Sequence, residues 1–291
     1  MKKLLITGSN GQLGRAINIE LAGSAEYELY NTDVAEGDGI HSLDITDVDA
    51  VTSLAKEIKP YAIINCAAYT AVDAQEKDRD LSYKINAIGP RNLAIAASDT
   101  GAKLVHISTD YVFAGDGNRP YTEFDKTGPV SAYGITKLAG ENFVKQFAHD
   151  FFILRTAWLY GDGKNFVKTM LRLSESHSEV SVVNDQLGTP TSTKELARAI
   201  HSLLPTENYG LFHATCEGST NWADFTDEIF RLAGRDTKVN HVSTEEYAAK
   251  NPQTAPRPAY SILDNYMFRL TGGYKFADWH DAIKAYIDEM K

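Results

Sequence analysis

Short apolar runs alternate with amphipathic stretches along the first half of the chain. The apolar runs at residues 4–6, 27–32, 62–65, 103–108 and 151–154 predict strands. The stretches at residues 13–22, 48–58, 81–97 and 132–148 have the apolar spacing of helices. Strands that alternate with helices in this way indicate βαβ units, so we predict an α/β fold with a doubly wound parallel sheet.

The regular alternation fades after about residue 158, where Gly, Asn and Asp become frequent. Helices are predicted at residues 193–204, 222–233 and 279–290. We therefore expect a first domain of residues 1–158, which also takes in a segment around residues 180–205. Residues 159–291 would mainly form a smaller C-terminal α/β lobe, with a cleft between the two parts.

Charge and composition exclude several classes of protein. The 291 residues carry 29 Lys and Arg against 39 Asp and Glu, a net charge of −10, which argues against nucleic acid or anionic membrane as a partner. The longest apolar stretch, residues 61–72, is broken by Asn65 and Thr70 and is too short to cross a bilayer. Neither Cys66 nor Cys216 lies in a metal-binding spacing. We expect a cytoplasmic protein without a metal site.

A glycine-rich loop, Gly8-Ser9-Asn10-Gly11-Gln12-Leu13-Gly14, connects the first predicted strand to the first predicted helix. Its glycines would permit a tight turn, close approach to a pyrophosphate and close packing of the helix on the sheet. Asp33 closes the next strand 19 residues beyond Gly14, where an acid can bind a ribose 2′-hydroxyl. This pattern predicts a dinucleotide-binding domain of Rossmann type. Because the carboxylate of Asp33 would repel a 2′-phosphate, it favours NADH over NADPH.

Two Tyr-x-x-x-Lys pairs raise the question of catalysis. Tyr160 and Lys164 flank a glycine-rich loop, whereas Tyr133 and Lys137 lie one turn apart on a predicted helix. There an ammonium group would stabilise a phenolate and bring the phenol pKa toward the working range. The hydroxyl of Thr109, at the end of a strand, would hydrogen-bond the reacting oxygen. The alternative is an incidental helix pair, which the glycine loop and Asp33 disfavour.

These residues resemble the extended short-chain dehydrogenase/reductase superfamily, and longer strings narrow the resemblance. Residues 65–73 (Asn-Cys-Ala-Ala-Tyr-Thr-Ala-Val-Asp), 108–113 (Ser-Thr-Asp-Tyr-Val-Phe), 155–158 and 184–191 are together similar to dTDP-4-dehydrorhamnose reductases. The resemblance covers nearly the whole chain. It implies that NADH or NADPH reduces the C4 ketone of dTDP-4-dehydro-6-deoxy-L-mannose to dTDP-L-rhamnose, a precursor of bacterial surface polysaccharides.

The resemblance also implies roles for individual residues. Tyr133 would donate the proton, Lys137 would tune Tyr133 and hold the nicotinamide ribose, and Thr109 would bind the reacting oxygen. The implied cofactor contacts are Gly8, Gly11, Gln12, Leu13, Gly14, Asp33, Asp44, Ile45, Ala67, Ala68, Tyr69, Ile107, Tyr133 and Lys137. The implied substrate contacts are Thr70, Val72, Thr109, Asp110, Tyr111, Tyr133, Trp158 and Arg257. Trp158 would stack on the sugar or serve as core, and the guanidinium of Arg257 would bind the diphosphate.

Several alternatives stay open on sequence alone. Some family members dimerise through glutamates that bind magnesium, but this chain has Gly14-Arg15-Ala16 at one such position, and Glu195 alone makes no site. We therefore expect no metal, and either a monomer or a homodimer. A 4,6-dehydratase would place Asp-Glu after the catalytic Thr, where this chain has Asp110-Tyr111. Another nucleotide-sugar reductase or epimerase, or a non-catalytic NAD(P)-binding regulatory subunit, is the alternative function.

Overall fold

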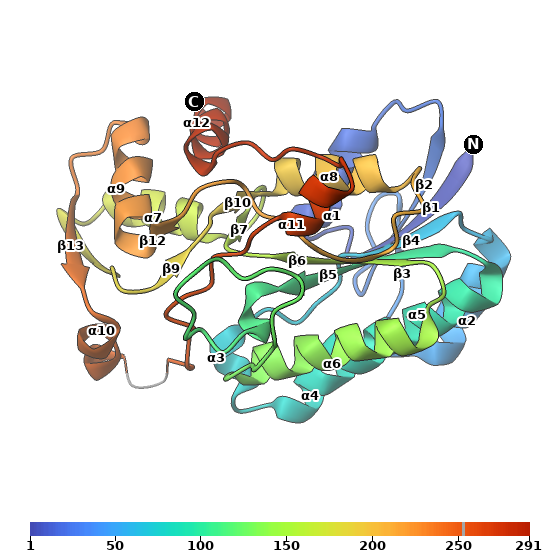
Figure 1. The fold of residues 1–291 in the computed structure, drawn as a ribbon. Helices are drawn as coiled ribbons and strands as arrows, with labels where there is room; N and C mark the ends of the chain where they lie inside the picture. The colour runs from blue at the N-terminus through green and yellow to red at the C-terminus, as the bar shows by residue number, and fades with distance from the viewer. Residues whose placement is uncertain (252–253) are drawn as a thin grey trace.

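A seven-stranded parallel sheet forms the centre of the protein (Figure 1). The computed structural model describes residues 1–251 and 254–291. The strands lie in the order β11-β6-β5-β4-β1-β2-β3, and each pairs in parallel with its neighbours. They are β1 (Lys2–Thr7), β2 (Tyr27–Asp33), β3 (Ile40–Ser42), β4 (Ala62–Asn65), β5 (Lys103–Thr109), β6 (Phe151–Thr156) and β11 (Gly210–His213). The predicted doubly wound α/β fold is confirmed. The strand order reverses between β1 and β4, so ligands are expected at the carboxyl ends of those strands.

Helices cover both faces of this sheet. Helices α1 (Gln12–Leu21), α8 (Thr193–Leu203) and α11 (Tyr266–Leu270) pack on one face, and α2 (Val48–Ile58), α5 (Gly89–Thr100) and α6 (Ala132–Phe147) pack on the other (Figure 1). The strand residues alternate accordingly, since Leu4 and Ile6 face the first layer and Leu5 faces the second. Each strand therefore contributes to two apolar cores, one on each face of the sheet. These cores hold in place the sheet edge from which the loops extend.

The helical stretch predicted at residues 81–97 consists of three joined pieces. Helix α4 (Arg79–Tyr83) leads into a π-helical turn, η1 (Lys84–Ile88), and then into α5, which ends at Gly101 with φ of 69°. Helix α6 crosses this turn so closely that a Cβ at Gly140 would lie 2.3 Å from the carbonyl oxygen of Asn86. Gly140 thus lets α6 lie close against η1.

The C-terminal lobe contains the helices predicted at residues 222–233 and 279–290, together with strands and further helices that the sequence pattern did not predict. Strands β8 (Glu179–Val183) and β13 (Lys238–Val242) pair in parallel, and α7 (Phe166–Ser174), α9 (Trp222–Ala233) and α12 (Trp279–Met290) share a separate apolar core. The remaining elements are α3 (Val72–Gln75), η2 (Asp110–Val112), β7 (Leu159–Tyr160), β9 (Leu187–Gly188), β10 (Thr191–Ser192), β12 (Thr220–Asn221) and α10 (Thr244–Lys250). Among the described residues, no helix combines the length and the apolar character needed to cross a bilayer.

The chain returns to the central sheet after it has entered the C-terminal lobe. Helix α8 packs against α1, and β11 extends the sheet beyond β6. Both elements lie after residue 158, and β11 also lies beyond the segment around residues 180–205. The division into residues 1–158 and 159–291 stays a prediction, and the sheet draws on residues from both sides of it.

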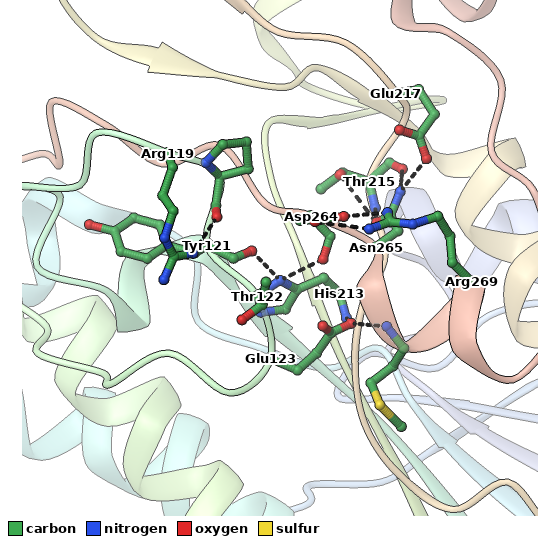
Figure 2. A network of polar contacts seen from close by, with 12 residues as sticks. Arg119, Tyr121, Thr122, Glu123, His213, Thr215, Glu217, Asp264, Asn265 and Arg269 are labelled. Carbon is green, nitrogen blue, oxygen red and sulfur yellow. Dashed lines mark hydrogen bonds and ion pairs between the residues drawn. The ribbon is translucent and has the colours of Figure 1, made fainter.

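A buried polar network ties the loop after η2 to β11 and to the segment before α11 (Figure 2). One oxygen of Glu123 accepts hydrogen bonds from the backbone N–H groups of His213 and Met267, at 2.8 and 3.1 Å. The ring Nδ1 of His213 lies 3.0 Å from the carbonyl oxygen of Tyr121 and 3.2 Å from that of Asp264. Burial lowers the pKa of His213 to about 3, so the ring is neutral and donates from Nδ1. This network fixes the loop that leads into α6.

Candidate active site

A cavity of about 420 Å³ opens at the carboxyl ends of β1, β4, β5 and β6. Its walls bring together Thr109, Tyr133 and Lys137, the three residues predicted to be catalytic. From the predicted cofactor and substrate sets it also contains Gly11, Gln12, Leu13, Ala67, Ala68, Ile107, Thr70, Val72, Asp110, Tyr111 and Trp158. Gly8, Gly14, Asp33, Asp44, Ile45, Tyr69 and Arg257 lie outside this cavity.

The glycine loop is shaped by two close approaches of the backbone. Gly8 has φ of 65°, and a Cβ on it would lie 2.6 Å from the backbone nitrogen of Ala67. A Cβ on Gly14 would lie 2.5 Å from the carbonyl oxygen of Gly8. Within residues 1–251 and 254–291, no side chain caps the N-terminus of α1, whose N-cap residue is Gly11. The unpaired N–H groups of this first turn suit the pyrophosphate of a dinucleotide.

Asp33 lies beside the glycine loop at the end of β2. Its carboxylate accepts hydrogen bonds from the backbone N–H groups of Asn10, at 3.0 Å, and Val34, at 2.8 Å. These bonds fix a partly exposed negative charge next to the loop. Asp44 is exposed, whereas the side chain of Ile45 is 4 % exposed and packs in the core beside the start of α5. Ile45 can therefore meet a cofactor only through its backbone.

The first turn of α6 places Tyr133 against the end of β5. The hydroxyl of Ser131 caps the helix by accepting a hydrogen bond from the N–H of Gly134 at 3.2 Å. A Cβ on Gly134 would lie 2.1 Å from the carbonyl oxygen of Tyr111, so only glycine lets α6 dock against η2. The rings of Tyr111 and Tyr133 meet edge to face at 5.4 Å. The glycine in Tyr-Gly-Ile-Thr-Lys thus serves docking.

Burial dominates the electrostatics of the residues predicted to be catalytic. It raises the pKa of Tyr133 to about 12, although a hydrogen bond with Thr109 lowers it in part. Burial also lowers the pKa of Lys137 to about 8, and its ammonium donates to the carbonyl oxygen of Ile107 at 2.5 Å. The pKa of Tyr133 is thus raised, not lowered as expected, and the hydrogen bond with Thr109, rather than the charge of Lys137, is the effect that opposes burial. Tyr133 consequently keeps its proton at neutral pH, which is the form able to donate one.

Asp110 is a buried acid adjacent to Thr109, the threonine predicted to be catalytic. It is 2 % exposed, and its Oδ1 accepts a hydrogen bond from the hydroxyl of Thr109 at 2.9 Å. Burial raises its pKa to about 6, and hydrogen bonds with Ser261 and Thr109 oppose that rise. A carboxylate at this wall of the cavity can accept a hydrogen bond from a hydroxyl group of a bound molecule.

The model of the RmlD substrate binding domain family matches residues 1–291. A dTDP-4-dehydrorhamnose reductase of Streptomyces griseus is 41 % identical over 288 residues, with 96 % of this chain and 91 % of the relative covered. The solved dTDP-4-dehydrorhamnose reductase of Clostridium acetobutylicum is 54 % identical, with a TM-score of 0.94 and 99 % of each chain covered. A Bacillus anthracis structure described as dTDP-4-dehydrorhamnose reductase in complex with NADP is 44 % identical, with a TM-score of 0.92 and both chains covered completely.

The chain belongs to the dTDP-4-dehydrorhamnose reductase family. The predicted resemblance and the oxidoreductase class are thereby confirmed, and the cofactor class is a nicotinamide dinucleotide. The glycine loop described above fits that group, because its backbone leaves no room for side chains at Gly8 and Gly14. Gly11, Gln12 and Leu13 would hold the pyrophosphate, and the bound group would supply a hydride.

A second cavity adjoins the reductase site. Its volume is about 590 Å³, and it shares Trp222 with the first cavity. Arg257 lies on its wall, where Nη2 pairs with the carboxylate of Asp73 at 3.2 and 3.3 Å. The guanidinium of Arg257 is also close enough to Tyr111, a residue of the first cavity, to oppose the rise that burial causes in the pKa of that phenol. Arg257 therefore lies at the boundary between the two cavities. Tyr69 instead borders a separate surface groove beside Asp73.

Trp158 adopts a backbone conformation that is rare for a residue with a side chain. Its φ is 48°. In a non-glycine residue, such a conformation costs on the order of 1–3 kcal/mol of strain. The indole stacks on that of Trp222, with ring centroids 3.6 Å apart and planes inclined by 9°. Such strain persists only where the surroundings impose it, and it is common at ligand sites.

Sequence reasoning missed part of the cavity wall. The additional lining residues are Asn65, Cys66, Ser108, Thr156, Ala157, Leu159 and Trp222. Several of them belong to the strings that carried the family resemblance. Trp222 gave no such signal, because it starts a helix of the other lobe. Burial raises the pKa of the Cys66 thiol to about 12, so this cysteine is a neutral part of the wall.

Possible metal ligands lie away from these cavities. The carboxylate of Glu195 accepts hydrogen bonds from Arg198, Tyr274 and the N–H of Ala277, each at 2.9 Å. In the described part of the chain, exposed side chains of Asp224, Asp227 and His241 come within 4.8 Å of one another on α9 and β13. The ligand spacing of this group could not be recognised in the sequence, since its members come from two elements.

Proposed function

We propose that the chain reduces the C4 ketone of dTDP-4-dehydro-6-deoxy-L-mannose to dTDP-L-rhamnose. The observation that carries this proposal is the convergence of Thr109, Tyr133 and Lys137 on one cavity with the glycine loop. The N-terminus of α1, which suits a pyrophosphate, and the protonated phenol of Tyr133 thus line the same cavity of about 420 Å³. That combination suits reduction of a carbonyl group, in which hydride and proton arrive at adjacent atoms.

Each catalytic residue has a defined task in this proposal. When substrate binds, the hydroxyl of Thr109 turns its one proton from Oδ1 of Asp110 to the ketone oxygen and stabilises charge there. The phenol of Tyr133 then transfers its proton to that oxygen, for which its raised pKa keeps it loaded. The ammonium of Lys137 stabilises the phenolate left behind and holds the nicotinamide ribose.

The substrate would extend from one cavity into the other. Trp158, Asp110, Thr70 and Val72 would contact the sugar, and the nucleotide would occupy the cavity of about 590 Å³. Arg257 lies at the boundary, where the diphosphate joins the two parts. Local donors of this kind explain how a chain with a net charge of −10 can bind two anionic ligands.

NADH is the proposed cofactor in preference to NADPH. The carboxylate of Asp33 lies beside the glycine loop, where it would repel a 2′-phosphate. The relative from Bacillus anthracis was solved with NADP, so a direct comparison of both cofactors is required. We also keep the predictions of a cytoplasmic location, absence of a metal and either a monomer or a homodimer. Light scattering after gel filtration measures the last of these.

The assay that tests the function follows NADH oxidation with a panel of 4-keto sugar nucleotides. The keto-sugar linked to dTDP should give the highest kcat/KM, and the same sugar linked to UDP should give less. NADH binding without turnover of any panel member would favour a regulatory subunit. Purified protein that retains NAD tightly, shown by its absorbance, would favour an epimerase. Either result would contradict the proposed reduction.

A further inference from the structure

The stacked indoles of Trp158 and Trp222 come from different parts of the molecule. Trp158 follows β6 of the central sheet, whereas Trp222 is the first residue of α9 in the C-terminal lobe. Their ring centroids are 3.6 Å apart with planes 9° from parallel, and both side chains line the first cavity. One wall of the sugar site therefore depends on a side chain that the other lobe supplies.

Trp222 supports the indole of Trp158 and is itself held by residues of its own lobe. One face of its indole lies on Trp158, and Phe166 lies 4.5 Å from its ring centroid with the planes inclined by 50°. Asn221 caps the helix directly before it, because its Oδ1 accepts a hydrogen bond from the N–H of Asp224 at 2.8 Å. Trp222 is thus fixed by its own lobe and presents a flat surface to Trp158.

Gly188 completes the slot at the edge of the Trp158 indole. A Cβ on Gly188 would lie 2.5 Å from Cε2 and 2.7 Å from Nε1 of that ring. Gly188 belongs to β9, which pairs antiparallel with β12, so that it lies opposite Thr220, two residues before Trp222. One small β ladder therefore holds both the residue beside the edge of the indole and the residue against its face.

The backbone conformation of Trp158 indicates that the contacts around its indole hold this residue in place. Its φ of 48° is uncommon for a residue with a Cβ, and such a conformation persists only where surrounding contacts impose it. Trp158 is also followed by β7, which pairs with β10, and its carbonyl oxygen accepts a hydrogen bond from Thr191 at 3.3 Å. The contacts of the second lobe thus fix both its backbone and its ring.

We propose that Trp222 and Gly188 are positioning residues that hold the indole of Trp158 against the sugar of the substrate. The inference rests on the proposed function, in which Trp158 contacts that sugar. Because the slot belongs to the C-terminal lobe, its loss should weaken sugar-nucleotide binding and leave cofactor binding unchanged. A merely structural role would instead affect both ligands through general loss of the fold.

The three tryptophans of the chain allow a matched set of variants. Trp222→Leu removes the stacking surface, Trp222→Phe keeps an aromatic surface without an indole, and Gly188→Ala inserts a Cβ at the ring edge. Trp279→Phe is the control, since Trp279 lies in the core of the C-terminal lobe and outside both cavities. Far-ultraviolet circular dichroism measures the exciton couplet of two stacked indoles, and steady-state kinetics gives KM for each substrate.

Wild type and Trp279→Phe should show the couplet, and both Trp222 variants should lack it. The KM for the dTDP-linked keto-sugar should rise about 3- to 10-fold in Trp222→Leu and stay within about 2-fold of wild type in Trp222→Phe. Gly188→Ala should alter the couplet and raise the same KM by about 10-fold or more. The KM for NADH should change less than about 2-fold throughout.

Two results would overturn the inference while the proposed function stands. One is a wild-type sugar-nucleotide KM in Trp222→Leu or Gly188→Ala. The other is an equal loss of affinity for NADH and the sugar nucleotide, which would indicate general destabilisation. Failure of the proposed function has a different readout. The wild-type protein would then show the couplet but would neither reduce the keto-sugar nor bind dTDP-L-rhamnose in calorimetry. In that case the positioning role would be wrong as well.

Discussion

The carboxylate of Glu141 accepts two hydrogen bonds from the guanidinium of Arg155, at 2.8 and 2.7 Å, behind the wall that carries Thr109. The hydroxyl of Ser108 donates to the same carboxylate at 2.6 Å. Glu141 also lies one helical turn beyond Lys137, whose pKa its charge raises against the larger effect of burial. The pair joins β6 to α6 and keeps negative charge near the catalytic lysine.

Glu141→Gln should lower the free energy of unfolding by about 3–5 kcal/mol, because it leaves the guanidinium of a buried Arg155 without a counter-charge. Urea unfolding followed by circular dichroism measures this loss. Lys168→Gln is the control, since Lys168 pairs with Asp162 at the surface and should contribute about 1 kcal/mol or less. Equal losses in the two variants would contradict the assigned importance of the buried pair.

Tyr133→Phe should reduce turnover of the keto-sugar by about 10²- to 10⁴-fold, since the proton donor is removed. NADH binding, measured by fluorescence titration, should weaken far less than turnover, because the hydroxyl of Tyr133 is only one of the implied cofactor contacts. The other Tyr-x-x-x-Lys supplies a control, Tyr160→Phe, because Tyr160 is 1 % exposed in the other lobe and its hydroxyl is not hydrogen-bonded within the described residues. That variant should keep turnover within about 2-fold. Normal turnover in Tyr133→Phe would falsify the assignment of the donor.

The pH profile of kcat/KM for the keto-sugar should decline on both sides of neutrality. As the pH rises through about 8, Lys137 loses the proton that makes it cationic and can no longer stabilise the phenolate. As the pH falls through about 6, Asp110 becomes protonated and loses its charge toward the sugar. Asp110→Asn should therefore remove the acid limb and keep the alkaline one. An unchanged acid limb in this variant would show that another group causes it.

Asp33→Ser should raise kcat/KM for NADPH relative to NADH by about 10-fold or more, because it removes the negative charge beside the glycine loop. The ratio is measured with both cofactors at a fixed keto-sugar concentration. Asp38→Ser is the matched control, since Asp38 is an exposed acid on the connection between β2 and β3. A wild-type preference for NADPH, or an equal change in the control, would count against Asp33 as the selecting residue.

The sequence pattern predicted elements whose residues alternate or repeat over a sufficient length. Helices α2, α9 and α12 and strand β4 have the predicted bounds, because each carries its whole periodic signal within its own residues. Strand β11 is as short as β4 but has only two apolar residues, Leu211 and Phe212, where β4 has three in a row. Strand β8 meets β13 across a long separation in the sequence. Local patterns carry no information on such pairings, so these strands were missed.

The same contrast holds for the site. Thr109, Tyr133, Lys137 and the glycine loop were predicted because each stands at the end of a recognisable strand or the start of a helix. Trp222 is a wall of the cavity only because β9 and β12 carry α9 there, which no local pattern shows. The side chain of Ile45 points into the apolar core, where it lies against Gly89 at the start of α5, and no local pattern shows that contact.

The return of the chain to the central sheet has a consequence for synthesis. When only the first 158 residues have emerged from the ribosome, β6 is still an edge strand. The backbone N–H and C=O groups of its apolar run Phe151–Leu154 are then unpaired on one side. Strand β11 closes that edge only after the chain has built much of the other lobe. A fragment that ends at residue 158 should therefore aggregate through β6. The two lobes should fold together, because the sheet is complete only when both are present.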